Sequence, residues 1–178
     1  MSEKHIRLIN PHTSYKQSYI DLLMEFKEIQ EPLIPFPLKL DYSDFPKMIG
    51  MLKGYSEGRN LKSGFVPHST YWLIADDEVV GVVNLRHELT ANLLKEGGHI
   101  GFGVRPSARN QGYATVLLKK TITKAVEKGI SAILVTCEKK NIASARVIQK
   151  NGGILDSEVF SPTHNDIIQR YWIYVDQE

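Results

Sequence analysis

The sequence predicts a single α/β domain built around a mixed central sheet. Runs rich in β-branched residues alternate with amphipathic segments along the chain, which is typical of strands and helices that share one core. A length of 178 residues suits one ordinary domain, and no linker or fixed-period repeat divides it. Apolar residues make up 42% of the chain and charged residues 24%, which excludes disordered, collagen-like and disulfide-scaffold proteins.

The first third of the chain predicts a strand and two helices. The strand is expected over residues 6–9. A helix should open at Thr13 or Ser14, and apolar residues at spacings of three and four over residues 19–29 form one face of it. Pro32 ends this helix because proline has no amide hydrogen. A second helix is expected over residues 43–56. A loop rich in Gly, Lys and Ser should follow over residues 58–68.

The rest of the chain predicts strands that alternate with helices. Strands are expected over residues 71–75, 79–85, 99–104, 131–137, 154–160 and 167–175. The first two of these strands should form a hairpin, because the polar turn Asp-Asp-Glu joins them. A short helix is expected over residues 88–95, and longer helices over residues 110–128 and 141–151.

Composition and charge exclude several classes of partner. The formal net charge is only +2, whereas a nucleic-acid-binding domain usually carries a strongly basic face. Cys137 is the single cysteine and has no intramolecular partner, so we expect a reducing, cytoplasmic compartment. The N-terminus has no apolar segment typical of a signal peptide, and no run approaches the length of a membrane helix. We therefore expect neither nucleic-acid nor membrane partners.

One stretch, VRPSARNQGYAT at residues 104–115, has the features of an anion-binding turn. A predicted strand ends where it begins, and a predicted helix opens near Asn110. The first turn of a helix has N–H groups without intrahelical partners and a partial positive charge, so it binds phosphate well. Gly112 and Ala114 would leave those amides uncovered, and Arg109 would add a fixed positive charge. The plainer alternative is that both small residues are merely permissive at a helix start.

These residues also carry a resemblance to a known family. The run RNQGYA, which begins at Arg109, resembles the Arg/Gln-x-x-Gly-x-Gly/Ala signature of the GNAT acetyltransferases. The run NIAS at Asn141, followed by NGG, is similar to the second motif of that family. The strand HIGFGVRP, which begins at His99, resembles a bacterial subset of predicted acetyltransferases. The likeness covers residues 71–175.

The resemblance implies a GNAT-type fold: a mixed, mostly antiparallel sheet with helices on both faces and a splayed parallel pair of strands. The strands that end near Val104 and Cys137 would be that pair, and acetyl-CoA would enter between them as the acyl donor, without a metal. It further implies a single acetyltransferase domain over residues 1–178, with a variable acceptor side (1–70) and an acetyl-CoA-binding core (71–175). The residues assigned to acetyl-CoA are Phe102, Gly103, Val104, Arg109, Asn110, Gln111, Gly112, Tyr113, Ala114, Thr115, Asn141 and Ser144.

By the same resemblance, backbone amides of residues 109–115 would hold the pyrophosphate of acetyl-CoA. Backbone groups of residues 102–104 would bind its pantetheine arm as an added strand. The side-chain amide of Asn141 would hydrogen-bond that arm. The alternative for Asn141 is a simple helix N-cap, and the two roles are compatible.

The acid and base of the reaction are less well marked. Ile148 stands where many relatives carry a tyrosine proposed to protonate the departing thiolate, and it has no proton to give. Gly98 and Ile100 occupy positions where relatives often present a glutamate or histidine base. His99 and Glu138 are therefore the candidate catalytic residues. A packed histidine and a solvated carboxylate are the alternatives for these two side chains.

The function implied is transfer of an acetyl group from acetyl-CoA directly to a primary amine of a small molecule or peptide. Two alternatives stay open: a non-catalytic module that binds acyl-CoA, and an acyltransferase that uses another thioester. Asn84, Arg86, His87, Tyr71 and Trp72 are candidates for lining the acceptor pocket, although a core aromatic or a surface charge would explain some of them. A homodimer is compatible with all three readings.

Overall fold

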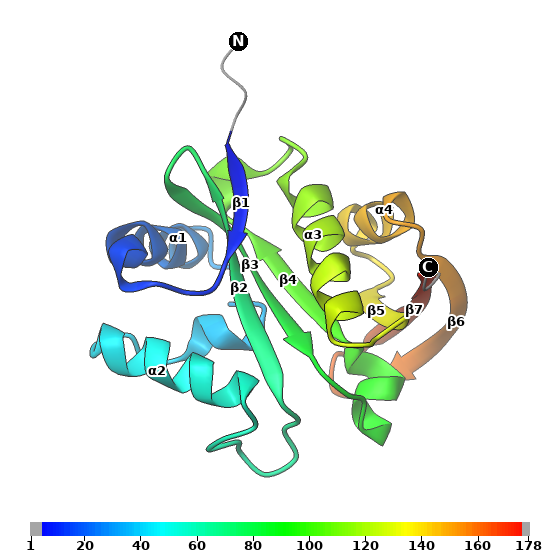
Figure 1. The fold of residues 1–178 in the computed structure, drawn as a ribbon. Helices are drawn as coiled ribbons and strands as arrows, with labels where there is room; N and C mark the ends of the chain where they lie inside the picture. Colours follow the sequence, from blue (N-terminus) through cyan, green and yellow to red (C-terminus); the bar gives the residue numbers. More distant parts are fainter. Residues whose placement is uncertain (1–4, 176–178) are drawn as a thin grey trace.

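The computed structural model describes residues 5–175. The first four residues, which open the N-terminal stretch discussed above, and the last three lie outside the described part. The main elements, labelled in Figure 1, are β1 (Ile6–Ile9), α1 (Lys16–Glu28), α2 (Phe45–Ser56), β2 (His68–Ala75), β3 (Glu78–Arg86), β4 (Ile100–Val104), α3 (Tyr113–Glu127), β5 (Ala132–Glu138), α4 (Ile142–Lys150), β6 (Ile154–Ser161) and β7 (Asp166–Tyr174).

The strands form one seven-stranded sheet in the order β1-β2-β3-β4-β5-β7-β6. Neighbouring strands are antiparallel, except that β4 and β5 are parallel. The predicted mixed, mostly antiparallel sheet is therefore confirmed. The predicted hairpin between β2 and β3 is confirmed too: Asp76 and Asp77 both have positive φ angles, as expected of a tight two-residue hairpin turn.

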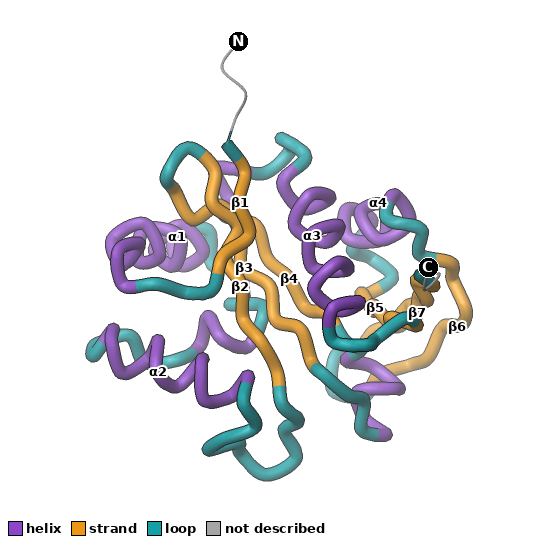
Figure 2. The backbone as a smooth tube through the Cα atoms, viewed as in Figure 1, coloured by secondary structure: helices purple, strands orange, loops and turns teal. Residues whose placement is uncertain are grey.

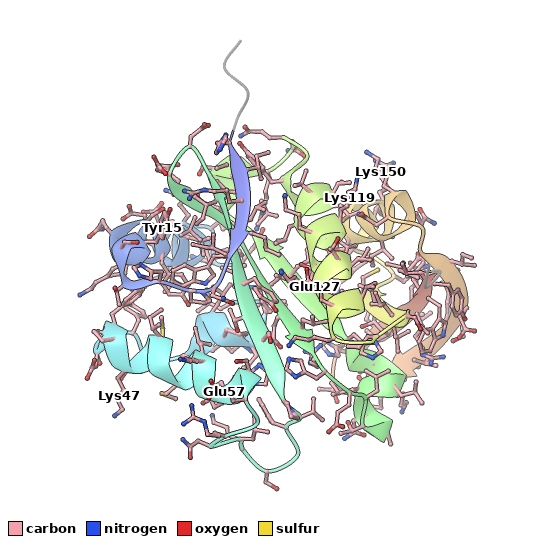
Figure 3. All side chains as sticks on the ribbon, in the orientation of Figure 1. Tyr15, Lys47, Glu57, Lys119, Glu127 and Lys150 are labelled. Atoms are coloured by element: carbon pink, nitrogen blue, oxygen red, sulfur yellow. The ribbon has the colours of Figure 1, made fainter. Side chains whose placement is uncertain are left out.

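Helices cover both faces of the sheet. In Figures 1 and 2, α1 and α2 lie on one side of the strands, and α3 and α4 on the other. Each side has its own apolar core: Trp72 and Val82 pack with α1 and α2, whereas Val83 and Ile100 pack with α3 and α4. The outer helix faces are charged, as Lys47, Lys119 and Lys150 illustrate in Figure 3. Because successive side chains of a strand point to opposite faces, β2 and β3 contribute residues to both cores.

Two predicted helices begin elsewhere than expected. The helix predicted from Asn110 begins at Tyr113, because Asn110 and Gly112 have φ angles of 60° and 82° that no right-handed helix accepts. The helix predicted over residues 88–95 is mainly a single wide turn at η3 (Leu93–Gly97). No helix among residues 5–175 is both long enough and apolar enough to cross a bilayer.

Candidate functional site

The strands β4 and β5 part almost as soon as they meet. Their ladder contains one aligned pair, Ile100 with Val135, at the very start of β4. Over the same residues β4 stays fully paired with β3, from Ile100 opposite Leu85 to Val104 opposite Gly81. The predicted splayed parallel pair is therefore present, and one edge of β4 faces a gap.

The β4 edge at this gap presents backbone groups of Phe102. His99 O and Arg105 N bond to β3, so antiparallel alternation turns the backbone of Phe102 toward β5. The carbonyl of Val104 accepts a hydrogen bond from Arg109 Nε at 3.2 Å. Gly103 is a glycine for a different reason: a Cβ there would collide with the carbonyl of Ile34. The segment after α1 thus packs against the bare face of β4.

His99 closes the end of the gap where the two strands meet. Its backbone N–H donates to Leu134 O at 2.7 Å, and its ring Nδ1 accepts from Leu134 N at 3.0 Å. Gly98 makes this approach feasible, because a Cβ there would lie 2.7 Å from Leu134 O and its φ is +65°. Burial, and then the charge of Arg86, lower the pKa of His99 to about 4. A neutral imidazole thus takes the place of a strand carbonyl at this junction.

The turn between β4 and α3 ends in an exposed helix N-terminus. Gly112 is the N-cap residue in a left-handed conformation, and it has no side chain with which to cap the helix. The first hydrogen bond within this end runs from Val116 N to Gly112 O at 3.2 Å. A Cβ on Gly112 would meet nothing within 4 Å. Gly112 is therefore needed for its backbone conformation, and it leaves the space in front of the helix open.

Neighbouring residues of this turn have structural contacts of their own. Gln111 Nε2 donates to Ser107 O at 3.4 Å, and Tyr113 is buried in the core beside α3. Ala114 and Thr115 are half-buried in the first turn of the helix. The amides of this first turn are the groups that a helix leaves without intrahelical partners.

Arg109 is placed differently from the expectation of a fixed charge at the entrance. Its guanidinium forms a two-pronged ion pair with Glu31, at 2.8 Å and 2.6 Å, and it lies 5.5 Å from the centre of the Phe26 ring. The Glu31 carboxylate largely offsets its charge. Glu25 makes a parallel contact, accepting from Arg105 Nε at 2.6 Å and from Ser107 N at 2.9 Å. The Glu25 contacts fasten the turn to α1, and the Glu31 pair fastens it to the segment that follows α1.

Asn141 caps α4 on the other side of the gap. Its Oδ1 accepts from Ser144 N at 3.1 Å, so the N-cap alternative is correct for the oxygen. Its side-chain NH₂ keeps the donors that the pantetheine role requires.

Two residues near the gap, Ile148 and Cys137, are buried or partly buried and have no group that is reactive at neutral pH. Ile148 is fully buried in the core beside α3, and a Cβ on Gly153 would collide with its side chain. Burial, and then the neighbouring Glu138, raise the pKa of the Cys137 thiol to about 11. The thiol is therefore protonated at neutral pH, which argues against a nucleophilic cysteine.

Glu138 ends β5 on the opposite face of the sheet from Val135, which belongs to the core beside α3. Its carboxylate is partly exposed and lies 3.2 Å from Lys140 Nζ and 3.2 Å from His164 Nδ1. This places a carboxylate near the end of the gap, on the face that α1 and α2 occupy.

The acceptor-side candidates divide into two groups. Trp72 is a core aromatic that stacks on Tyr19 with ring centres 4.7 Å apart, and Tyr71 belongs to the core beside α3. Asn84 and Arg86, in contrast, line a small pocket together with residues from the first third of the chain. His87 lies just outside it, with Nε2 at 2.8 Å from Ser69 Oγ.

Sequence reasoning missed two groups that complete this pocket: His68, and the aromatic pair Phe36 and Phe65. These side chains are far apart in the sequence and no motif joins them. The one available signal for His68 was a run of three polar residues, HST, directly before the apolar part of the strand. Within residues 5–175, no cluster of three or more His, Cys, Asp or Glu side chains could hold a metal ion.

Comparison with known proteins agrees with this geometry. Residues 21–153 match the model of the acetyltransferase (GNAT) family, which begins earlier in the chain than the motifs alone indicated. An uncharacterized N-acetyltransferase of Bacillus subtilis, YjdG, is 28% identical over 137 residues, which cover 75% of this chain and 73% of that protein.

Solved structures share the fold at low sequence identity. RimL, a ribosomal L7/L12 alpha-N-protein acetyltransferase solved with coenzyme A, has a TM-score of 0.71 at 18% identity, covering 96% of this chain and 94% of that one. The microcin C7 self-immunity acetyltransferase MccE, solved with acetyl-CoA and AMP, has a TM-score of 0.68 at 15% identity, covering 96% and 92%.

Proposed function

Because the chain belongs to the GNAT acetyltransferase family, we propose that it transfers an acetyl group from acetyl-CoA to a primary amine of a small molecule or peptide. The observation that carries this proposal is the parting of β4 and β5 directly beside the open N-terminus of α3. A thioester arm can enter such a gap while its pyrophosphate rests on helix amides.

The donor site is proposed to consist mainly of backbone groups. The first-turn amides of α3 would bind the pyrophosphate, helped by the helix dipole. The backbone of Phe102 would hydrogen-bond the pantetheine arm as an added strand, and the Asn141 NH₂ would hold it from the other side. Arg109 would act by fixing the turn to the segment after α1 through Glu31 rather than by contacting phosphate.

The proposed domain division follows from the two faces of the sheet. Residues 1–70 would form the acceptor side, since the loop after α1 packs on β4 and contributes Phe36 to the pocket beside β3. Residues 71–175 would form the donor side. Together they make a single acetyltransferase domain.

In the proposed reaction, the neutral amine attacks the thioester carbonyl, a C–N bond forms, and the C–S bond breaks to release coenzyme A as thiolate. The ammonium proton must leave the nitrogen. Of the two candidate bases, Glu138 has carboxylate oxygens on the acceptor face, whereas the Nδ1 lone pair of His99 is already engaged by Leu134 N. We therefore assign Glu138 as the base, and His99 as a residue that positions the strand junction.

Ile148 cannot protonate the thiolate, since it is an alkyl side chain enclosed in the core. A thiol of ordinary pKa, about 8.5, is a tolerable leaving group, so water can supply the proton.

Coenzyme A release tests this function. The purified protein is given acetyl-CoA and a panel of small amines and short peptides, and free thiol is measured against a sample without acceptor. Acceptor-dependent release is expected, and Glu138→Gln should slow it by about 10²-fold or more. Binding of acetyl-CoA without release for any acceptor would favour a non-catalytic acyl-CoA-binding module. Preference for a longer acyl thioester would favour an acyltransferase that uses a donor other than acetyl-CoA.

A further inference from the structure

A small pocket lies on the acceptor face, where β2 begins and β3 ends. Figure 2 shows the loop between α2 and β2 at this end of the sheet. The pocket has a volume of about 150 Å³, enough for a small polar group and water. Its lining residues are Phe36, Gly64, Phe65, Val66, His68, Asn84, Arg86 and Leu93. The walls are mostly apolar and include no carboxylate, so the polar groups present decide what the pocket binds.

The first polar group is the ring of His68, which is only 3% exposed. Its Nδ1 lies 2.7 Å from Asn84 Nδ2, which also lies near Ser69 O and Thr70 Oγ1. An amide nitrogen donates, so Nδ1 accepts and the ring proton lies on Nε2. That buried Nε2 has no hydrogen-bond partner in the described part of the chain. The wall of the pocket therefore includes a histidine whose buried ring N–H lacks an acceptor.

The second polar group is the guanidinium of Arg86. Its Nη1 donates to the carbonyls of Gly97 and Gly98, both at 3.0 Å, so its position is fixed. Among residues 5–175, no carboxylate forms an ion pair with it. Burial lowers its pKa, as expected of a cation without a counter-ion. Lys62 adds a second cation nearby, 5.5 Å from the centre of the Phe36 ring.

This pocket adjoins the place where β4 and β5 part. A Cβ on Gly101 would lie 3.9 Å from Arg86 Nη2, and Gly101 follows the single residue of β4 that pairs with β5. The guanidinium also holds the carbonyls of the turn that leads into β4. A group bound by Arg86 would thus sit next to the proposed transfer point.

We propose that this pocket binds an anionic group, a carboxylate or a phosphate, on the acceptor molecule, so that the substrate class is an acidic amine. This inference rests on the proposed function, because it assigns a subsite to the same transfer site. The anion accepts from His68 Nε2 and from the free edge of the Arg86 guanidinium, and it supplies the counter-ion that the fold omits. The Phe36 and Phe65 rings, 5.0 Å apart, cover the methylene groups between the anion and the amine.

Matched acceptor pairs test the proposal on the wild-type protein. The pairs are 4-aminobutyrate with 4-aminobutanamide, serylglutamate with serylglutamine (both as C-terminal amides), and phosphoethanolamine with ethanolamine. For each pair, kcat/KM is measured with acetyl-CoA and corrected for the fraction of unprotonated amine. We expect the charged member of at least one pair to be preferred roughly 10- to 100-fold, the range expected for a hydrogen-bonded charge. Preference within the first two pairs indicates a carboxylate, and within the third a phosphate.

Variants of Arg86 test whether the preference for charged acceptors arises in this pocket. Arg86→Gln should lower the charged-to-neutral ratio roughly 10-fold or more, and Arg86→Lys should fall in between, since it keeps the charge and loses the fork. Arg59→Gln is the matched control, because Arg59 is an exposed arginine paired with Glu57 and should leave the ratio intact. Circular dichroism confirms that each variant is folded.

The proposal and the proposed function fail in different ways. Equal kcat/KM within every acetylated pair overturns the anionic subsite and leaves acetyl transfer standing. If no pair is acetylated, calorimetry with succinate and with inorganic phosphate decides. Binding of either anion to the wild type, weakened by Arg86→Gln, supports the pocket. Absence of binding at up to about 10 mM, at low ionic strength, overturns it.

Discussion

The two sides of the proposed site present different groups to their ligands: backbone groups on the donor side and side chains on the acceptor side. On the donor side, the named side chains are already engaged: Arg109 with Glu31, and the Asn141 oxygen with Ser144. What faces the gap there is backbone, from Phe102 on β4 and from the first turn of α3. On the acceptor side, the backbone is paired in β2 and β3, and the unmatched groups are side chains, His68 Nε2 and the Arg86 guanidinium.

This difference has a physical consequence for recognition. A backbone site binds what every donor molecule shares, such as phosphate and an amide-bearing arm, and it tolerates side-chain change outside its glycine. A side-chain site carries specificity, because each buried polar group that lacks its partner costs free energy. We therefore expect substitutions on the donor side to weaken acetyl-CoA binding when they block the backbone groups. Substitutions on the acceptor side should instead change which acceptor is preferred, because they remove charged or hydrogen-bonding groups.

The largest expected effect comes from a shape change on the donor side. Gly112→Asp should weaken acetyl-CoA binding by about 100-fold or more, since a carboxylate would displace and repel the pyrophosphate at the helix amides. The fold should persist, because Asp is a good N-cap residue and tolerates a left-handed backbone better than most. Isothermal calorimetry measures the affinity.

Gly112→Asn is the matched control, being equal in size and uncharged. It should lose less affinity than Gly112→Asp, and the gap between the two variants reports the charge alone. Undiminished affinity in a folded Gly112→Asp protein would show that the N-terminus of α3 does not bind the pyrophosphate.

The next effect concerns stability beneath the donor side. Ile148→Ala should lower the free energy of unfolding by about 2–5 kcal/mol, as for a fully buried aliphatic side chain. Denaturant unfolding measures the loss. Turnover of the protein that stays folded should change little. A drop in turnover without loss of stability would mean that Ile148 takes part in the reaction rather than in packing.

Acid should lower the stability of the fold through three neutral histidines, two of them buried and one half-buried, near the acceptor pocket and the strand junction. Burial is the largest cause that lowers the pKa of His68, His87 and His99 to about 4 in the folded protein, against about 6.5 unfolded. The unfolded state therefore binds more protons between these values, and stability falls as pH drops from 6.5 to 4. Each histidine adds at most about 1.4 kcal/mol per pH unit.

Unfolding measured at several pH values checks this slope. His99→Gln should reduce this slope. A pH slope that survives His99→Gln in full would show that this histidine is not held neutral by its place between β4 and β5.

The smallest effect is expected at Arg109. Because Glu31 offsets its charge, Arg109→Gln should weaken acetyl-CoA binding by less than about 10-fold. Calorimetry in parallel with the Gly112 variants gives the comparison. A loss as large as that of Gly112→Asp would show that the donor site uses this guanidinium directly.

The same contrast explains which parts the sequence could predict. The turn around Gly112 was predictable, because a backbone site restricts which residues fit and so leaves a local pattern. The splayed strands followed only from the family resemblance that this pattern carries. The order of strands and helices followed from hydrophobic periodicity. The ion pair between Arg109 and Glu31 was not predictable, since it joins segments 78 residues apart.

The acceptor pocket was even harder to predict from the sequence than the ion pair. Asn84 and Arg86 could be named as candidates at the end of a strand, but Phe36 and His68 meet them only through the packing of α1, α2 and the sheet. The protonated nitrogen of His68 is set by Asn84, a contact that no spacing rule encodes. Side-chain sites of this kind depend on tertiary structure from the start.

A crystal structure with coenzyme A bound tests the contrast between the two sides most directly. We expect pyrophosphate oxygens within hydrogen-bond distance of the first-turn amides of α3, with Arg109 still paired to Glu31. We also expect the pantetheine arm along the free edge of β4 at Phe102. A pyrophosphate held chiefly by side chains, with Arg109 swung away from Glu31 to reach it, would contradict the account.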